Sequence, residues 1–275
     1  MSIGLFAKAL PRPTLADTCA AVRALGCDTV QFNLSCVGVP TLPAHLDAAV
    51  CDQIAHTVRQ HGITMAALSA TGNLIQPDPI QRQAVHAGIA TLIRASARVG
   101  TQLLTIATGT CHPHDMWQAH ADNATPASWH ALLDALAGLL PLAEAHGVTL
   151  AFEPEQGNVV RTVAQARALL DTCASPALAV VLDVANLLNV ATMNQQMQVI
   201  DEAFGLRAAD MTLIHLKERA PDGTSGHLVP GQGVIDYRYL WHVSARAGVR
   251  VPMVMHELPR ALVAPTVRWW HQLGE

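Results

Sequence analysis

Four apolar segments in the second half of the chain each end in a side chain that can bind a metal ion. The segments are Thr149–Glu153, Val180–Asp183, Thr212–His215 and Met253–Glu257. Their last residues are separated by 30, 32 and 42 positions, each close to the length of one strand–helix unit. Parallel strands that end in these groups would bring three carboxylates and one imidazole to one point. Such an oxygen-rich set suits a divalent ion such as Mn²⁺, Mg²⁺ or Co²⁺, with Zn²⁺ also possible.

Each of these four positions also has a structural alternative. Glu153 could hydrogen-bond a helix N-terminus, and Asp183 could cap the helix that follows it. A single His is more often a core residue than a ligand, but His215 ends the third of four matching segments. At the last position His256 competes with Glu257, because only one of two adjacent strand residues points inward. The pattern of the other three segments favours Glu257.

The elements that must position these groups alternate along the whole chain. Amphipathic segments are followed by runs rich in β-branched residues, which begin at Gly26, Gly62, Gly100, Gly147 and Gly248. Gly just past a helix is the expected C′ residue, because it adopts the left-handed conformation without a Cβ penalty. Apolar stripes predict helices around 46–58, 85–93 and 129–143. Strands are predicted at about 3–7, 28–34, 63–69, 102–108, 148–153, 178–183, 211–216 and 252–257.

Eight alternating units with no linker predict one α/β domain over residues 1–275, a (β/α)₈ TIM barrel and not an open doubly wound sheet. The barrel explains why polar residues mark the strand ends, since active sites of this fold lie at the carboxyl face. A polar loop at roughly 218–236 accounts for the longest of the three intervals.

Composition places the chain among core-rich globular proteins, with 51% hydrophobic and 14% charged residues. A net charge of −4 offers no broad attraction for a polyanion, so no nucleic-acid partner is expected. Six scattered cysteines without a CxxC pair are typical of reduced core residues. The first apolar stretch is too short for a secretory signal, and no stretch would span a membrane. A cytoplasmic enzyme without a membrane partner is therefore expected.

Four segments, three of which include the strand ends described above, have the sequence pattern of a known family. They are Leu150–Glu155, Leu182–Leu187, Ile214–Glu218 and the Gly-x-Gly-hydrophobic-x-Asp run within Gly231–Tyr237. With these, the chain resembles the sugar phosphate isomerase/epimerase superfamily, the xylose isomerase-like TIM barrels. The resemblance covers most of the chain in architecture, and its specific motifs lie at roughly residues 148–257.

This resemblance implies one divalent ion held by the tetrad Glu153, Asp183, His215 and Glu257. It also implies an isomerase or epimerase of a sugar, keto-sugar or sugar acid, acting through α-proton abstraction and a metal-stabilised enediolate. The two Glu residues would serve as base and acid on opposite faces of the substrate. A small carbohydrate substrate and a homo-oligomer, dimer or tetramer, are implied as partners.

Five residues are predicted to contact the substrate: Asn33, His112, Trp117, Asn186 and Lys217. Lys217 follows His215 by two positions and so shares its side of a strand; the alternative is a surface Lys. Asn186 stands where ketose 3-epimerases usually have a His. His112 and Trp117 belong to a polar loop after the fourth strand. His112 is predicted to be an acid/base or hydroxyl-binding group, and Trp117 is predicted to stack on a sugar ring. The alternative is that this loop only connects a strand to a helix.

Three other functions compete with the isomerase. A dehydratase or lyase on a keto-polyol or keto-sugar, similar to inosose dehydratase, would use the same metal and proton abstraction but expel a β-hydroxyl. An apurinic-site endonuclease would need additional His ligands, which the Asn186 position and the loop after His215 do not supply. A non-catalytic binding barrel would have no reason to keep all four proposed ligands.

Overall fold

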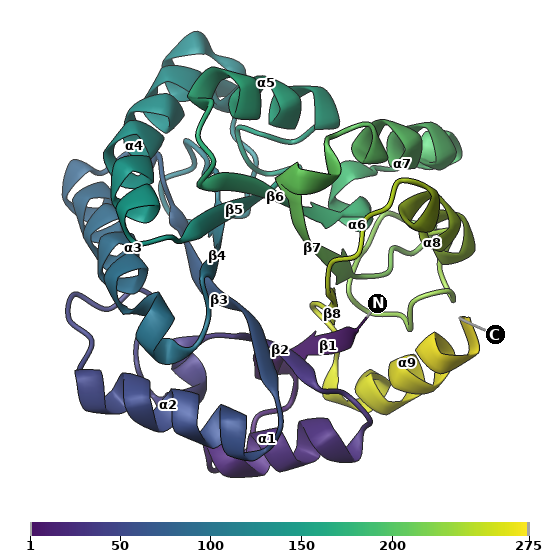
Figure 1. Cartoon of the computed structure of the whole chain (residues 1–275). Coiled ribbons are helices and arrows are strands. Elements are labelled where there is room, and N and C mark those ends of the chain that lie inside the picture. Colours follow the sequence, from purple (N-terminus) through teal and green to yellow (C-terminus); the bar gives the residue numbers. More distant parts are fainter. Residues whose placement is uncertain (1, 274–275) are drawn as a thin grey trace.

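Eight parallel strands pair in sequence order and close into a barrel, with β8 hydrogen-bonded to β1 (Figure 1). The computed structural model describes residues 2–273. The strands are β1 (Ile3–Phe6), β2 (Thr29–Phe32), β3 (Thr64–Asn73), β4 (Leu103–Ala107), β5 (Thr149–Glu153), β6 (Leu178–Asp183), β7 (Met211–Leu216) and β8 (Met253–Met255). The predicted (β/α)₈ barrel is confirmed.

Helices follow each strand and form the outer ring seen in Figure 1. They are α1 (Leu15–Ala24), α2 (Ala48–Gln60), α3 (Pro79–Val99), α4 (Pro126–Ala145), α5 (Val163–Cys173), α6 (Val184–Leu187), α7 (Gln196–Phe204), α8 (Tyr237–Arg246) and α9 (Arg260–Leu273). Short 3₁₀ turns are η1 (Ala7–Ala9), η2 (Leu34–Val37), η3 (Ala121–Ala124), η4 (Met193–Gln195) and η5 (Ala208–Asp210). No helix within residues 2–273 combines the length and the apolar character that a membrane span requires.

Local sequence signals explain where several of these helices begin and end. The Thr125 side chain accepts a hydrogen bond from the Ser128 backbone N–H, and Pro126 occupies the first turn of α4. Gly100 ends α3 in the left-handed conformation, with φ of 111°. Strand ends differ from prediction chiefly at β3, which continues to Asn73, and at β8, which ends at Met255 instead of reaching residue 257.

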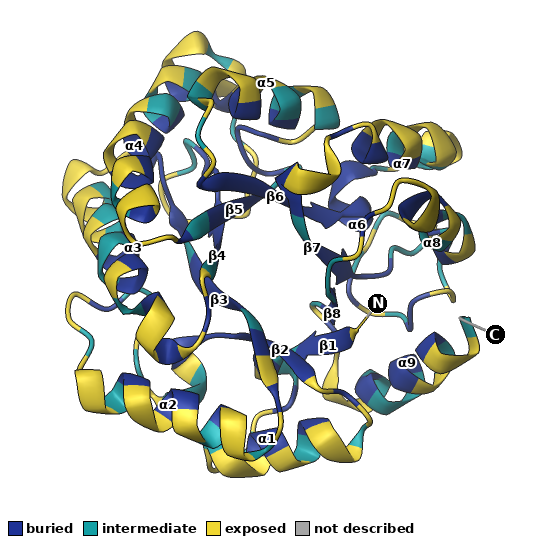
Figure 2. Ribbon diagram, viewed as in Figure 1, coloured by how far each residue is buried: buried dark blue, intermediate teal, exposed yellow. Residues whose placement is uncertain are grey.

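Alternate residues of each strand face two different apolar clusters. The larger cluster packs the outer face of the barrel against the helices and includes Phe152, Leu182 and Met255. A smaller cluster fills the barrel interior and consists of Ala67, Ala151, Ala179, Val181, Leu213 and Val254. Figure 2 shows the strands almost wholly buried, while the helices expose their outer faces. Residues two positions beyond the interior cluster therefore emerge at the carboxyl mouth of the barrel.

Candidate active site

Strand alternation brings three of the four predicted ligands to one point at the barrel mouth. Glu153, Asp183 and His215 each follow an interior apolar residue by two positions, on β5, β6 and β7 respectively. Asp183 pairs directly with His215 across β6 and β7. His215 Nδ1 lies 3.2 Å from Glu153 Oε1 and 3.9 Å from Asp183 Oδ2. These three side chains form a compact group at the centre of the mouth.

The fourth member of this group is His256. On β8 the interior residue is Val254, so alternation directs His256 inward two positions later. Atoms of Glu153, Asp183, His215 and His256 lie within 4.8 Å of one another, the spacing that a bound ion would need. The ring of His256 stacks on His215, with centroids 4.1 Å apart and planes 14° apart. On its other side the ring stacks on Phe6 at 5.3 Å.

Glu257, the predicted fourth ligand, lies outside this compact group. Its backbone has φ of 49°, the left-handed region, so the chain turns out of the strand direction at this residue. Its side chain is 54% exposed and lines the main cavity. The carboxylate turns back toward the barrel, because Oε2 lies 3.2 Å from Lys217 Nζ. Glu257 therefore faces the same space from the rim.

Buried donor atoms at the site lack hydrogen-bond partners, which tests whether the residues suit a metal ion. Among residues 2–273, four buried side-chain polar atoms have no such partner, and three belong to this group: Asp183 Oδ2, His215 Nδ1 and His256 Nδ1. An unsatisfied buried polar atom costs about 1–3 kcal/mol. A cation among these lone pairs would remove that cost. Carboxylate and imidazole donors are also the ligands that divalent ions use, so the site fits a metal.

Lys217 is buried among the carboxylates, with 3% of its side chain exposed. Its Nζ lies 3.5 Å from Asp183 Oδ2 and donates to Asn186 Oδ1 at 2.5 Å. The Asn186 amide nitrogen in turn donates to Glu153 Oε1 at 2.6 Å. Asn186 thus links Glu153, the candidate base, to Lys217. Among the described residues, Lys217 provides the only ammonium group in contact with Asp183. Asn186 and Lys217 are both buried and lie outside the described lining of the main cavity, so their predicted substrate contacts stay predictions.

Burial and charge shift the pKa values around this centre in opposite directions. Burial raises the pKa of Asp183 to about 6, although the Lys217 ammonium opposes the shift. Burial would lower the pKa of Lys217, but the carboxylates of Asp183, Glu153 and Glu257 raise it above its ordinary value. Burial would raise the pKa of Glu153, yet His215 and Lys217 hold it well below its usual range. Glu153 is therefore ionised and Lys217 charged near neutral pH.

The loop after β7 is tied down by Glu218, whose buried carboxylate accepts hydrogen bonds from backbone N–H groups. These donors are Arg219 at 2.9 Å, Gly231 at 2.6 Å and Ile235 at 3.1 Å. A Cβ at Gly233 would collide with the Arg219 carbonyl and the Glu218 carboxylate. Asp236 then caps α8 by accepting from the Tyr239 N–H at 2.9 Å. The Gly-x-Gly-hydrophobic-x-Asp run therefore fixes the conformation of the loop beside the site.

The carboxyl mouth contains a cavity of about 640 Å³. Its lining includes Glu153, Phe6, Asn33, Trp117 and Leu258. Apolar rings beside a few polar groups are typical of small-molecule binding sites, in which the polar groups fix the orientation of the ligand. Glu155 also lines this cavity, and burial raises its pKa to about 7.

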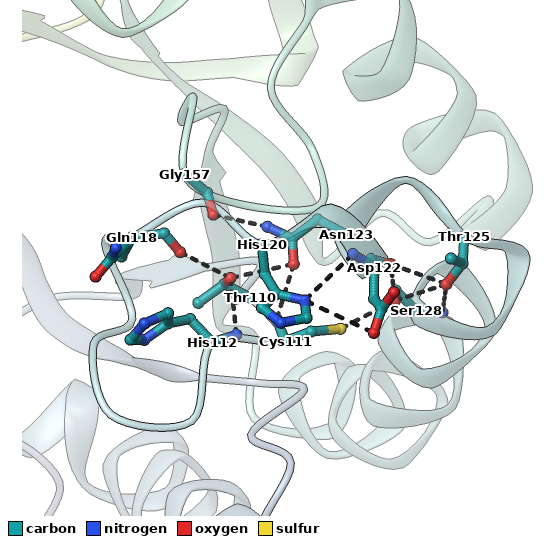
Figure 3. Close-up of polar contacts among 10 residues, drawn as sticks. All are labelled: Thr110, Cys111, His112, Gln118, His120, Asp122, Asn123, Thr125, Ser128 and Gly157. Atoms are coloured by element: carbon teal, nitrogen blue, oxygen red, sulfur yellow. Dashed lines mark hydrogen bonds and ion pairs between the residues drawn. The ribbon is translucent and has the colours of Figure 1, made fainter.

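The loop after β4 is held by three buried Asn side chains. Asn73 donates to the Thr110 carbonyl at 2.8 Å, Asn158 donates to the Met116 carbonyl at 3.0 Å, and Asn123 donates to the Gly157 carbonyl at 2.9 Å. Figure 3 shows Asn123 between Thr110 and Gly157. These bonds cross-link the loops after β3, β4 and β5. The loop that carries Trp117 is therefore held in place by hydrogen bonds to neighbouring loops.

The two substrate contacts predicted on this loop have different positions. Trp117 lines the cavity and is 53% exposed at its mouth. His112 is not among the described residues of the cavity lining. Its Nδ1 accepts a hydrogen bond from the Asp115 backbone N–H at 3.0 Å, which stabilises the loop itself. Asn33 lines the cavity, and its Oδ1 accepts from the Ser35 N–H and the Thr41 hydroxyl.

Sequence patterns did not single out Gln31 or Glu155. Gln31 lies on β2 between Val30 and Phe32, and a polar residue between two apolar strand residues is the signal that points to it. Its Oε1 lies 2.8 Å from His215 Nε2. Glu155 follows Glu153 by two positions, but the spacing of strand ends gives no reason to select it.

Comparison with known proteins identifies the architecture. A family model described as a xylose isomerase-like TIM barrel matches residues 19–273. No curated protein matches the chain in sequence. Among solved structures, the 3-keto-D-glucoside 4-epimerase YcjR from E. coli superposes with a TM-score of 0.78 at 15% identity, covering 99% of each chain.

Two other solved structures have similar relationships to the chain. An L-ribulose 3-epimerase has a TM-score of 0.74 and 18% identity, covering 99% of this chain and 94% of its own. The IolI protein, solved with a zinc atom, has a TM-score of 0.71 and 17% identity, covering 100% and 96%. At such identities the likeness establishes the fold alone.

Proposed function

The chain belongs to the xylose isomerase-like TIM barrel family, and from that membership we propose that it is a metal-dependent isomerase or epimerase of a small carbohydrate. The observation that supports this most is the convergence of Glu153, Asp183 and His215 at the barrel mouth, where Asp183 and His215 have unpartnered polar atoms and Glu153 lines the cavity. Two of the solved structures with this fold are sugar epimerases, and a third was solved with zinc. Together these favour a divalent ion and a carbohydrate.

The proposed ligands are Glu153, Asp183 and His215, with Glu257 as the fourth. A divalent ion held there would polarise a carbonyl and the hydroxyl beside it and so acidify the adjacent C–H. With three carboxylates and one imidazole, Mn²⁺, Mg²⁺ or Co²⁺ is the expected ion.

Glu153 is proposed as the base, because its carboxylate is ionised and oriented by the amide of Asn186. Glu257 is proposed as the acid that returns the proton. One carboxylate lies on β5 and the other just after β8, and these strands are separated by two strands on one side of the barrel and four on the other. The two carboxylates therefore approach a substrate from different directions. Return of the proton to the same carbon gives epimerisation, and return to the neighbouring carbon gives isomerisation.

One experiment tests this reaction class directly. Metal-reconstituted protein is incubated in D₂O with a panel of keto-sugars and sugar acids, and products are followed by NMR and mass spectrometry. Deuterium at the carbon next to a carbonyl, with no alkene or dione formed, supports the proposal. A dehydrated product would support the lyase instead, and the absence of both exchange and metal binding would contradict an enzyme of this kind.

Loss of metal affinity is expected to identify the ligand at the end of β8. Since the His215 and His256 rings are stacked almost in parallel, their in-plane nitrogen lone pairs do not converge on one ion. We therefore expect Glu257→Gln to weaken metal binding by more than about tenfold. His256→Phe, which keeps the ring stack without a nitrogen donor, should retain the ion. Titration calorimetry with Mn²⁺ measures both, and the reverse result would make His256 the ligand.

Trp117→Ala is expected to raise KM about twofold to tenfold and to leave kcat nearly unchanged. For a sugar face stacked on an exposed indole we expect a contribution similar to that of a stacked aromatic pair, about 0.5–1.5 kcal/mol. Loss of uniform binding appears in KM alone. Ile80→Ala, an exposed apolar side chain outside the cavity lining, serves as the matched control. A fall in kcat with KM unchanged would show that Trp117 acts in the chemical step instead.

A further inference from the structure

Gln31 is a buried polar side chain inside the barrel that contacts the imidazole of His215. It lies on β2, is 2% exposed, and lines the cavity. Its Oε1 is 2.8 Å from His215 Nε2, and its amide nitrogen donates to the Thr105 hydroxyl at 3.2 Å. Thr105 lies on β4 and is also buried. A polar bridge from β2 therefore reaches both β4 and β7 across the barrel interior.

The direction of the hydrogen bonds made by Gln31 determines which nitrogen of His215 can bind a cation. An amide oxygen only accepts hydrogen bonds, so the nitrogen that faces it must carry the proton. With the Gln31 N–H group directed at Thr105, the oxygen faces His215, and Nε2 is the protonated nitrogen. In the neutral ring, which is the form that binds a metal ion, the lone pair available for a ligand is then on Nδ1. This is the atom that lies 3.2 Å from Glu153 Oε1 and has no hydrogen-bond partner among the described residues.

Two contacts together fix the orientation of the ring. The stack on His256, with planes 14° apart, sets the plane of the imidazole. The bond to Gln31 sets its rotation within that plane, since only one edge can meet the amide oxygen. Metal-binding His residues commonly donate their second N–H to such an outer partner, which fixes the tautomer and the direction of the ligand atom.

We propose that Gln31 is a positioning residue that keeps a proton on His215 Nε2 and thereby directs Nδ1 toward Glu153 and Asp183. The inference rests on the proposed function only in naming a metal ion as the group that Nδ1 binds. The protonation pattern of His215 is a property of the protein alone, so it can be measured without metal or substrate.

Gln31→Met and Gln31→Glu form the matched pair that tests this role. Methionine keeps the approximate shape of the side chain and removes the amide oxygen, whereas glutamate keeps an oxygen acceptor. Loss of an outer partner typically weakens metal binding 10–100-fold, so we expect that loss for Gln31→Met and near-wild-type affinity for Gln31→Glu. Mn²⁺ titration calorimetry measures the affinity. Thr105→Val, which frees the other end of the amide, is expected to give a smaller loss.

Nitrogen NMR of metal-free protein labelled with ¹⁵N-histidine is the second readout. The wild type should show a His215 Nε2–H signal that is protected from solvent exchange, and Gln31→Met should lose it. A wild-type His215 with a bare Nε2 overturns the inference, as does unchanged Mn²⁺ affinity in Gln31→Met. If the wild type binds no divalent ion but shows the protected Nε2–H, the proposed function fails and the positioning role of Gln31 stands. If Gln31→Met does not fold, the inference is tested by the His215 signal in the wild-type spectrum and by the Mn²⁺ affinity of Thr105→Val.

Discussion

Replacement of Glu153 by Gln is expected to lower kcat by about 10²–10⁴-fold, the range that a positioned general base contributes. Glu153 is the carboxylate proposed to remove the proton, and it is ionised near neutral pH. Its pKa lies well below the usual range, because His215 and Lys217 outweigh the effect of burial. It is also held by the 2.6 Å hydrogen bond from the Asn186 amide. Glutamine keeps the shape and the acceptor oxygen but cannot take up a proton.

The measurement is turnover at saturating metal together with the rate of deuterium incorporation from D₂O. Both rates should fall together, because both depend on the same proton removal. Glu202→Gln, an exposed carboxylate on α7, is the matched control and should be indistinguishable from wild type. Glu257→Gln is expected to abolish turnover as well. A Glu153→Gln variant that turns over at a near-wild-type rate with the ion bound would remove Glu153 from the mechanism.

The barrel and the convergence of Glu153, Asp183 and His215 could be predicted because both depend on strand periodicity. Glu153, Asp183 and His215 each complete a regular apolar run, so one rule of alternation places all three at the mouth. Asp183 and His215 are even paired neighbours across β6 and β7. No tertiary information was needed for these positions, and the strand bounds were accurate to a residue or two around them.

The end of β8 could not be predicted in the same way because the strand stops early. Counting residues in an extended strand cannot reveal that Glu257 adopts a φ of 49° and turns its carboxylate back toward Lys217. Alternation from Val254 selects His256, whereas the chemistry of the other segments selects Glu257. The predicted roles of these two residues therefore stay predictions, as does the expected homo-oligomer.

Gln31 and His112 illustrate contacts that depend on tertiary structure. Gln31 is separated from His215 by 184 positions, and only closure of the barrel brings them together. His112 looked like a substrate contact because it lies in a polar loop with Trp117. In the fold its ring nitrogen binds the backbone of its own loop. Residue type and strand-end position were informative, but loop conformation decides which side chain of a polar cluster reaches the cavity.

Replacement of Lys217 by Met is expected to destabilise the metal-free protein by about 3–5 kcal/mol, the cost typical of removing one partner from a buried ion pair. The Lys217 ammonium lies 3.5 Å from Asp183 Oδ2 and 3.2 Å from Glu257 Oε2. Without it, the buried Asp183 carboxylate loses its nearest cationic group. Methionine fills much of the same volume, so the loss reports on charge more than on packing. Thermal unfolding should show a decrease in Tm of about 6–20 °C.

Addition of Mn²⁺ should restore much of the stability lost in Lys217→Met, because a bound cation supplies the positive charge that the ammonium provided. The rise in Tm on adding Mn²⁺ should be larger for the variant than for wild type, since binding stabilises the folded state in proportion to affinity and removal of a nearby ammonium strengthens cation binding. Lys8→Met, an exposed cavity lysine away from Asp183, is the control and should respond as wild type. An equal deficit with and without Mn²⁺ would mean that Lys217 and the ion do not compensate the same carboxylates, and the metal would then have to be sought elsewhere than between Asp183 and Glu257.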